Sequence, residues 1–137
     1  MRDAIIEPGS LVLEGNTLSV GVRMPWYRAL PLSSVCDLVL DIDGHAIDKA
    51  STRWLINGVN YREEELPPLY QDWWFVADTA ILSGTLSDDA VAALDPAADH
   101  AVHVGLGIYI PYIDAGNGTL LVHEGNRETM KLEKKVA

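Results

Sequence analysis

The chain has 137 residues, of which 48% are hydrophobic, and it carries 10 Lys and Arg against 20 Asp and Glu, for a formal net charge of −10. This length predicts a single domain, residues 1–137, with enough apolar side chains to form a core, which excludes wholesale disorder. Because an acidic surface repels polyanions, nucleic acid and anionic membranes are not expected as partners.

The single cysteine, Cys36, has no partner for an internal disulfide, which is typical of a protein in a reducing compartment. Its place at the start of an apolar strand pattern favours a buried, inert thiol over a nucleophile. Residues 1–10 lack the apolar run of a signal peptide, and no stretch approaches the ~18 apolar residues of a membrane span. The sequence therefore predicts a cytoplasmic protein.

Alternation of apolar and polar residues predicts β-strands along most of the chain. In 18–24 the residues Leu18, Val20, Val22 and Met24 share one face. In 36–43 the residues Cys36, Leu38, Leu40 and Ile42 oppose three aspartates, and Asp43-Gly44 predicts a tight turn. The same dipeptide chemistry at Asn57-Gly58 predicts a hairpin between 53–56 and 59–61.

Further along the chain, residues 73–82 predict one strand, and residues 101–113 carry the longest alternation. A last hairpin is expected across Gly125-Asn126. Helix signals are confined to 87–95, where Ser87 can cap the first turn and Pro96 ends it, and to a single turn before Pro67. Roughly eight short strands with frequent turns predict an all-β fold, a single antiparallel β-sandwich (jelly-roll-like), with a barrel as the alternative.

Residues that could carry chemistry are scattered. His100 and His103 are three apart on a predicted strand, so their imidazoles point to opposite faces and do not converge on a metal. Asp41 and Asp43 share a face that we expect to be solvated, which does not favour general acid–base chemistry. The chain also lacks the sequence motifs of a nucleophile elbow or a phosphate loop. We therefore expect this chain to hold no catalytic residue and no metal.

The aromatic residues are the informative feature. They cluster in two irregular segments, "MPWYRALP" and "LPPLYQDWWF", and Trp54 is expected in the core. All of them could be core residues, or they could form an interface, because Trp, Tyr and Arg dominate binding hot spots. Two prolines stiffen the first segment and would lower the cost of ordering it on binding. The candidate interface or pocket residues are Trp26, Tyr27, Arg28, Pro31, Tyr70, Trp73 and Trp74.

The same segments carry a resemblance to a known family. The strings "VRMPWYRALPLSSVCDLVLDIDG", "WLINGVNYREEEL", "WWFVADTAIL" and "GLGIYIPYI", taken in this order, are similar to the small β subunit of C-glycoside deglycosidases. The similarity runs from about residue 18 to residue 112, which is most of the chain. Its most specific part is the pattern R-x-P-x-Y-R-x-L-P-L-S, which begins at Arg23.

The resemblance implies a β-sandwich that associates with a larger TIM-barrel α subunit. The complex would cleave the C–C bond between a 3-oxo sugar and its aglycone by β-elimination, and the isolated chain would be inactive. A divalent metal, expected to be Mn²⁺, and a proton-transferring histidine would belong to the α subunit. On this basis we expect residues 24–31 to lie against the barrel near its active-site mouth. The alternatives are a stand-alone sandwich that binds a carbohydrate or an aglycone, and a purely structural partner subunit.

Overall fold

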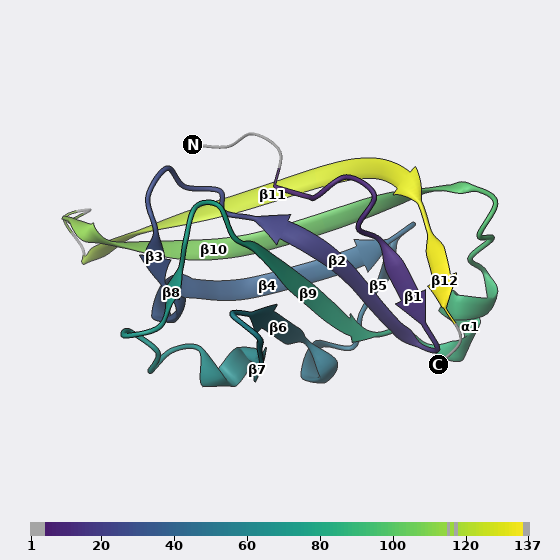
Figure 1. Ribbon diagram of the computed structural model, residues 1–137, viewed down its shortest axis with the longest axis horizontal. Coiled ribbons are helices and arrows are strands. Elements are labelled where there is room, and N and C mark those ends of the chain that lie inside the picture. The colour runs from purple at the N-terminus through teal and green to yellow at the C-terminus, as the bar shows by residue number, and fades with distance from the viewer. Residues whose placement is uncertain (1–4, 115, 117, 136–137) are drawn as a thin grey trace.

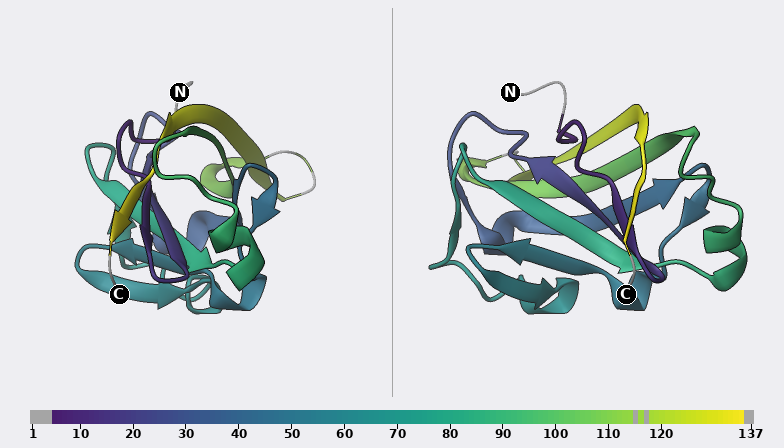
Figure 2. Two further views of the ribbon diagram at one scale, coloured as in Figure 1. Left: turned by 90° about the vertical axis from the view of Figure 1, so that its right-hand side faces the viewer. Right: turned by 45° about the vertical axis from the view of Figure 1, so that its right-hand side comes forward.

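The computed structural model describes residues 5–114, 116 and 118–135. Most of these residues belong to two large β-sheets that face each other across one core (Figures 1 and 2). The sheets confirm the predicted all-β fold, with the short helix α1 (Asp88–Ala92) at one end.

The first sheet contains six strands in the order β12-β1-β2-β9-β6-β7. Their bounds are β12 (Glu133–Lys135), β1 (Val12–Glu14), β2 (Thr17–Arg23), β9 (Thr79–Thr85), β6 (Arg53–Ile56) and β7 (Val59–Arg62). Neighbours pair antiparallel except for β1 and β12, which are parallel. This one pairing departs from the all-antiparallel sheets that the sequence predicts.

The second sheet has the order β11-β10-β4-β5 and is antiparallel throughout. Its strands are β11 (Thr119–Lys131), β10 (Asp99–Asp114), β4 (Val35–Ile42) and β5 (His45–Ala46). A short ribbon of β3 (Leu30–Pro31) and β8 (Trp73–Trp74) lies at one end of the molecule (Figure 1). Single 3₁₀ turns occupy Leu32–Ser34, Lys49–Ser51 and Glu63–Glu65, the last of which is the turn expected before Pro67.

The core lies between the two sheets and is made by the inward face of each strand. Alternate apolar residues of β2, β4 and β10 point into it, and these are Leu18, Val20, Val22, Leu38, Leu40, Ile42, Val102, Val104, Leu106, Ile108 and Ile110. Trp54 is fully buried, as predicted, and its ring meets that of Trp74 edge-on with 5.0 Å between centroids. A buried edge-to-face pair of rings contributes to stability beyond the free energy gained by burying its apolar area.

The sequence predicts a buried Cys36, but the structure places this residue outside the core. Asp37 adopts a positive φ of 51°, and the pairing of β4 with β10 shifts register between Gly105 and Gly107. Between these two pairs β4 has one residue more than β10, which is a β-bulge. The bulge turns Val35 inward and leaves Cys36 half-buried on the outer side of the sheet. A Cβ at Gly107 would lie 2.9 Å from the Cys36 sulfur, so the close approach that this glycine permits comes from the chain itself.

Both dipeptide turns are confirmed. Asp43 and Gly44 have φ values of 50° and 84°, and Asn57 and Gly58 have values of 54° and 77°. Positive φ at both central residues is the geometry that suits the twist of a two-residue hairpin. The two turns join β4 to β5 and β6 to β7. Ser87 caps α1 as predicted, because its hydroxyl accepts a hydrogen bond from the backbone N–H of Ala90.

Two predicted elements are wrong. Residues 73–82 are not one strand, because β8 ends at Trp74 and a turn closed by the hydrogen bond from Asp78 N–H to the Phe75 carbonyl precedes β9. The hairpin across Gly125-Asn126 does not form either, since β11 runs straight through it and pairs Gly125 with Gly105. The side chain of Asn126 instead accepts a hydrogen bond from the Ile6 N–H. Residue types that favour turns can thus remain inside a strand when neighbouring segments supply their hydrogen-bond partners.

Candidate functional site

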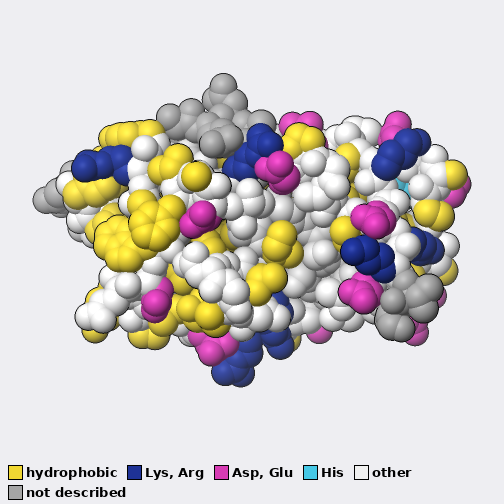
Figure 3. All heavy atoms as spheres, viewed as in Figure 1, with side chains coloured by type: hydrophobic (Ala, Val, Ile, Leu, Met, Phe, Trp, Pro, Cys, Tyr) yellow, Lys and Arg dark blue, Asp and Glu magenta, His cyan; other side chains and the backbone are white. Residues whose placement is uncertain are grey.

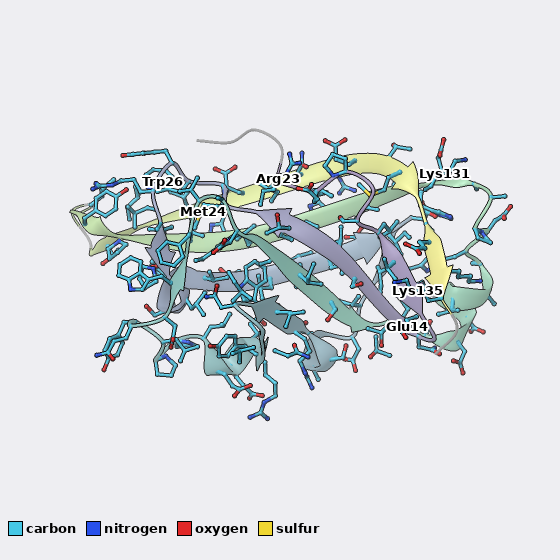
Figure 4. The ribbon with its side chains drawn as sticks, in the orientation of Figure 1. Glu14, Arg23, Met24, Trp26, Lys131 and Lys135 are labelled. Carbon is cyan, nitrogen blue, oxygen red and sulfur yellow. The ribbon has the colours of Figure 1, made fainter. Side chains whose placement is uncertain are left out.

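The proline-flanked segment is a loop between β2 and β3, and its two ends are anchored in the core. Met24 and Pro25 are buried, and Trp26 is half-buried against core residues. Tyr27 is 59% exposed, and Arg28 is exposed as well. The loop therefore keeps its ends in the core and exposes the next two side chains to solvent. Figure 4 labels Trp26 on this loop.

A residue from the end of β10 completes this group. The indole N–H of Trp26 donates a hydrogen bond to the hydroxyl of Tyr112, whose ring has the Arg28 guanidinium carbon 4.9 Å from its centroid. The rings of Trp26 and Tyr27 are also 4.9 Å apart. We call these four residues the Tyr112 cluster. Sequence reasoning did not include Tyr112, although it ends the longest alternating strand and follows Pro111 outside the apolar pattern.

The phenol groups of the cluster titrate differently. The hydrogen bond with Tyr112 raises the pKa of Tyr27. Partial burial acts to raise the pKa of Tyr112, but the hydrogen bonds with Trp26, Tyr27 and Arg28 and the charge of Arg28 outweigh it and lower this pKa below its usual value. The cluster therefore favours developing negative charge on one oxygen, that of Tyr112.

A second group of exposed aromatic residues lies near the β3–β8 ribbon. Backbone hydrogen bonds from Leu32 to Asp72 and from Ser33 to Leu69 hold the segment that carries them. Tyr70 is 67% exposed, and Trp73 is partly exposed as the outer member of β8. The exposed Phe75 belongs to the same stretch, and the sequence analysis did not include it.

Two of the predicted site residues do not belong to this surface. Trp74 is fully buried, and its indole N–H donates to the Asp78 carbonyl inside the chain. Pro31 is buried in β3, opposite Trp73. The alternation of β8 explains the difference, since Trp73 and Trp74 are adjacent and must point to opposite sides. We therefore remove Trp74 and Pro31 from the candidate surface.

The exposed aromatic residues share one end of the sandwich, which we call the aromatic end. Hydrophobic side chains gather there over β3 and β8, whereas basic and acidic side chains are mixed at the opposite end (Figure 3). Single exposed apolar residues are ordinary, but a concentration of exposed aromatic residues is typical of an interaction site. The members that remain from the sequence prediction are Trp26, Tyr27, Arg28, Tyr70 and Trp73, joined by Phe75 and Tyr112.

The histidines of the second sheet pair with aspartates of β4 and its turn. The Nδ1 atom of His100 lies 2.6 Å from Asp43 Oδ2, that of His103 lies 3.1 Å from Asp41, and His123 Nε2 lies 3.0 Å from Asp37. Asp41 and Asp43 are therefore not simply solvated as expected. Among the described residues, no group of three His, Cys, Asp or Glu side chains has the geometry to hold a metal ion.

None of the helices in the described part of the chain could span a bilayer, since α1 has only five residues.

The chain was compared with known proteins. The family model of the C-glycoside deglycosidase beta subunit matches residues 14–112. A C-glycoside deglycosidase beta subunit of Microbacterium trichothecenolyticum is 44% identical over 130 residues, 94% of this chain and 95% of the relative. One of Arthrobacter globiformis is 39% identical over 135 residues, covering 98% and 99%. The 3'-dehydrocarminate deglycosidase beta subunit of a Microbacterium species is 33% identical over 138 residues, covering 99% and 98%. The chain thus belongs to the C-glycoside deglycosidase beta subunit family.

Proposed function

We propose that this chain is the small subunit of a two-chain enzyme that cleaves the sugar–aglycone C–C bond of 3-oxo C-glycosides. In this proposal the partner is a TIM-barrel α subunit that holds the reaction centre, and the aromatic end of the sandwich covers its active-site mouth. The single observation that carries the proposal is the aromatic end itself. It carries Tyr27, Tyr70 and Phe75, which are 59%, 67% and 54% exposed and are the most exposed large apolar residues that the structure describes.

Burial energetics support a covered surface at this end. An aromatic side chain hides roughly 150–250 Å² when it is buried, and apolar area is worth about 25 cal/mol per Å². Several such side chains on a proline-stiffened loop lose little conformational entropy on docking. The barrel face that carries active sites is rich in loops, so a second chain that excludes water from it is physically reasonable.

The proposed chemistry needs no acid–base pair in this chain. A ketone at C3 acidifies the proton on C2, so a base of the partner can remove this proton. The electron pair then forms the C1–C2 double bond, and the bond from C1 to the aglycone carbon breaks. That carbon leaves with its electron pair and takes up a proton. The name of one relative, 3'-dehydrocarminate deglycosidase, agrees with a substrate oxidised at position 3'.

The described residues do not fit a metal, because no three potential ligands converge among them. We therefore assign the divalent metal that the family resemblance implies, expected to be Mn²⁺, to the α subunit. No step that we assign to this chain depends on it.

Co-expression with a C-glycoside deglycosidase α subunit tests the proposal. We expect the two chains to co-elute from a sizing column and the complex to cleave a 3-oxo C-glycoside, with neither chain active alone. The variants Tyr27→Ala and Arg28→Ala should lower turnover or assembly, whereas Val59→Ala, an exposed apolar residue on the edge strand β7, should change neither.

The outcomes also separate the alternatives. A monomer that binds a glycoside or an aglycone by itself, and that ignores the α subunit, would contradict the proposal in favour of a stand-alone binding protein. Assembly that needs the aromatic end, combined with unchanged turnover in every aromatic variant that still assembles, would leave the chain a purely structural subunit.

A further inference from the structure

We propose that Arg28 forms an ion pair with a carboxylate of the α subunit when the aromatic end docks, and that the ring of Tyr112 positions its guanidinium group for this contact. The inference rests on the proposed function and names the chemistry of the partner surface that faces this end. Arg28 is exposed on the loop between β2 and β3, so its charged group can be reached from outside the chain.

Two segments that are distant in the sequence hold Arg28. Its guanidinium carbon lies 4.9 Å from the centroid of the Tyr112 ring, within the range of a cation–π contact. Tyr112 belongs to β10, and its hydroxyl accepts a hydrogen bond from the indole N–H of Trp26, which is on the same loop as Arg28. The loop therefore helps to fix the ring on which its own arginine lies. A side chain that is already held loses less conformational entropy when it binds.

Arg28 keeps its positive charge in this position. The face of a ring attracts a cation without neutralising it, and a guanidinium group has five N–H donors in one plane. The Lys and Arg residues that pair with carboxylates among the described side chains are Arg23, Lys49, Arg62 and Lys131, and Arg28 is not one of them. Arg23 is the informative comparison, because it ends β2 just before the same loop and pairs with Glu7 inside the chain.

Docking of the aromatic end removes water from Arg28. The proposed contact covers the exposed aromatic residues beside it and thereby the guanidinium group as well. A charge that loses its water is tolerated at an interface only when an opposite charge and hydrogen bonds replace the water. A carboxylate meets both needs, because its two oxygens match two parallel N–H groups of a guanidinium.

The partner subunit, rather than the sugar, is the source of this carboxylate. A 3-oxo sugar has hydroxyl and ketone oxygens but no charge, so it can accept hydrogen bonds from Arg28 without neutralising it. On a chain with a net charge of −10, a cation within the aromatic end is a point that attracts an acidic side chain of the partner. The geometry and the charge therefore select an Asp or Glu on the α subunit.

The isolated chain tests whether Tyr112 positions Arg28. A ring shifts the NMR signals of protons above its face upfield, so the side-chain signals of Arg28 should lie upfield of their usual positions. Tyr112→Leu should abolish this shift, whereas Tyr112→Phe, which keeps the ring, should retain most of it. Tyr109→Leu is the matched control, because Tyr109 is a comparably exposed tyrosine on the same strand. Arg28 signals that do not respond to Tyr112→Leu would overturn the positioning role.

Association with the α subunit tests the ion pair. Truncating one member of a charge pair that is covered at an interface weakens binding roughly thirtyfold or more, so Arg28→Ala should raise the dissociation constant of the complex by this factor. Arg28→Lys keeps the charge but not the planar fork, and it should recover part of the loss. Arg28→Glu should bind more weakly than Arg28→Ala, and one substitution of an acidic residue of the α subunit by Lys should restore its binding.

Lys135→Glu is the control for net charge. It makes the same change in charge as Arg28→Glu, but at an exposed residue of β12, near the opposite end of the sandwich (Figure 1). Because salt screens charges that are distant from the contact, this variant should change the dissociation constant by no more than about twofold. An equal effect of the two charge reversals would overturn the ion pair.

Failure of the proposed function would look different from failure of this inference. If the wild-type chain associates with no α subunit, the proposed function falls and the ion pair falls with it. If the wild-type complex forms and is active, but Arg28→Ala assembles within about twofold of it, only the ion pair falls. A raised KM in that assembled variant would then assign Arg28 to an anionic group of the substrate instead.

Discussion

The two ends of the sandwich differ in how their polar groups are satisfied. At the end that carries α1, the buried imidazole of His100 bridges Asp43 Oδ2 at 2.6 Å and the Asp95 carbonyl at 2.7 Å. The backbone N–H of Ala101 donates to the other oxygen of Asp43. We call this the histidine end. At the aromatic end, by contrast, apolar rings are exposed, and the hydrogen bond from the Trp26 indole N–H to the Tyr112 hydroxyl lies at the surface.

The contrast distinguishes polar contacts that stabilise the fold from side chains that are exposed for contact with another molecule. Both partners of His100 are acceptors, so the imidazole must donate from both ring nitrogens. Each ring nitrogen thus has its hydrogen-bond partner within the chain. Burial acts to lower the pKa of His100, but Asp43 and the Asp95 carbonyl outweigh it and raise this pKa. A perturbed histidine in a buried site can suggest catalysis. Here it joins the β4–β5 turn to the segment between α1 and β10.

The largest effect on stability is expected from substituting one of the two adjacent tryptophans at the aromatic end. Trp74→Ala should lower the free energy of unfolding by about 4 kcal/mol, because it empties a fully buried site beside Trp54. Trp73→Ala, the adjacent and partly exposed residue, should cost less than about 1 kcal/mol. Urea denaturation of both variants measures this. Equal losses would mean that the two tryptophans do not divide between core and surface.

At the histidine end, His100→Gln should lower the free energy of unfolding by about 2 kcal/mol near pH 6, since a buried carbonyl and Asp43 lose a charged donor. The pH dependence has a definite sign. The raised pKa of His100 contributes stability that is full below about pH 6.5 and is lost as the pH rises through the folded value.

The carboxylate sets the lower limit of this window. Burial acts to raise the pKa of Asp43, but the hydrogen bonds from His100 and the Ala101 N–H, together with the charges of His100 and His45, outweigh it and lower this pKa. The contribution of Asp43 is therefore present above about pH 4 and is lost as the pH falls further. The difference between wild type and His100→Gln should therefore be largest between about pH 4 and 6.5. His103→Gln, which breaks a half-exposed pair with Asp41, is the control and should show a smaller loss. A difference that grows above pH 8 would contradict the assignment.

The smallest effect on stability is expected at Tyr70. Because its side chain is 67% exposed, Tyr70→Ala should change the free energy of unfolding of the isolated chain by no more than about 0.5 kcal/mol. The same variant should weaken association with the α subunit if the second aromatic group lies in the contact. A thermal melt and a sizing column separate the two readouts, and a large stability loss would place Tyr70 in the chain's own packing.

The strands that alternate strictly could be predicted from the sequence, and the irregular ones could not. Leu18 to Met24 and the two dipeptide turns are local signals, because side-chain period and positive φ depend on few neighbours. The wrong elements depend on distant contacts. Gly125 remains in a strand because Gly105 pairs with it, and residues 73–82 divide because Trp74 pairs with Leu30. The family resemblance covers the same segments but contains no pairing information.

The candidate site was predicted in part for the same reason. Proline-flanked aromatic residues near Trp26 are a signal within one segment, and the structure places Tyr27 and Arg28 on the surface. Tyr112 is 86 residues from Trp26 in the chain, and only the fold brings the two side chains together. Trp74 is among the predicted residues because the sequence does not say which of two adjacent tryptophans faces the core until the pairing of the strand is known.

The length of β10 has a consequence for the size of any assembly. This one strand carries His100 near its beginning and Tyr112 near its finish. At about 3.3 Å per residue, the two side chains are separated by roughly 40 Å. If the α subunit covers the tyrosine, as proposed, the opposite tip of the sandwich therefore lies well outside that contact.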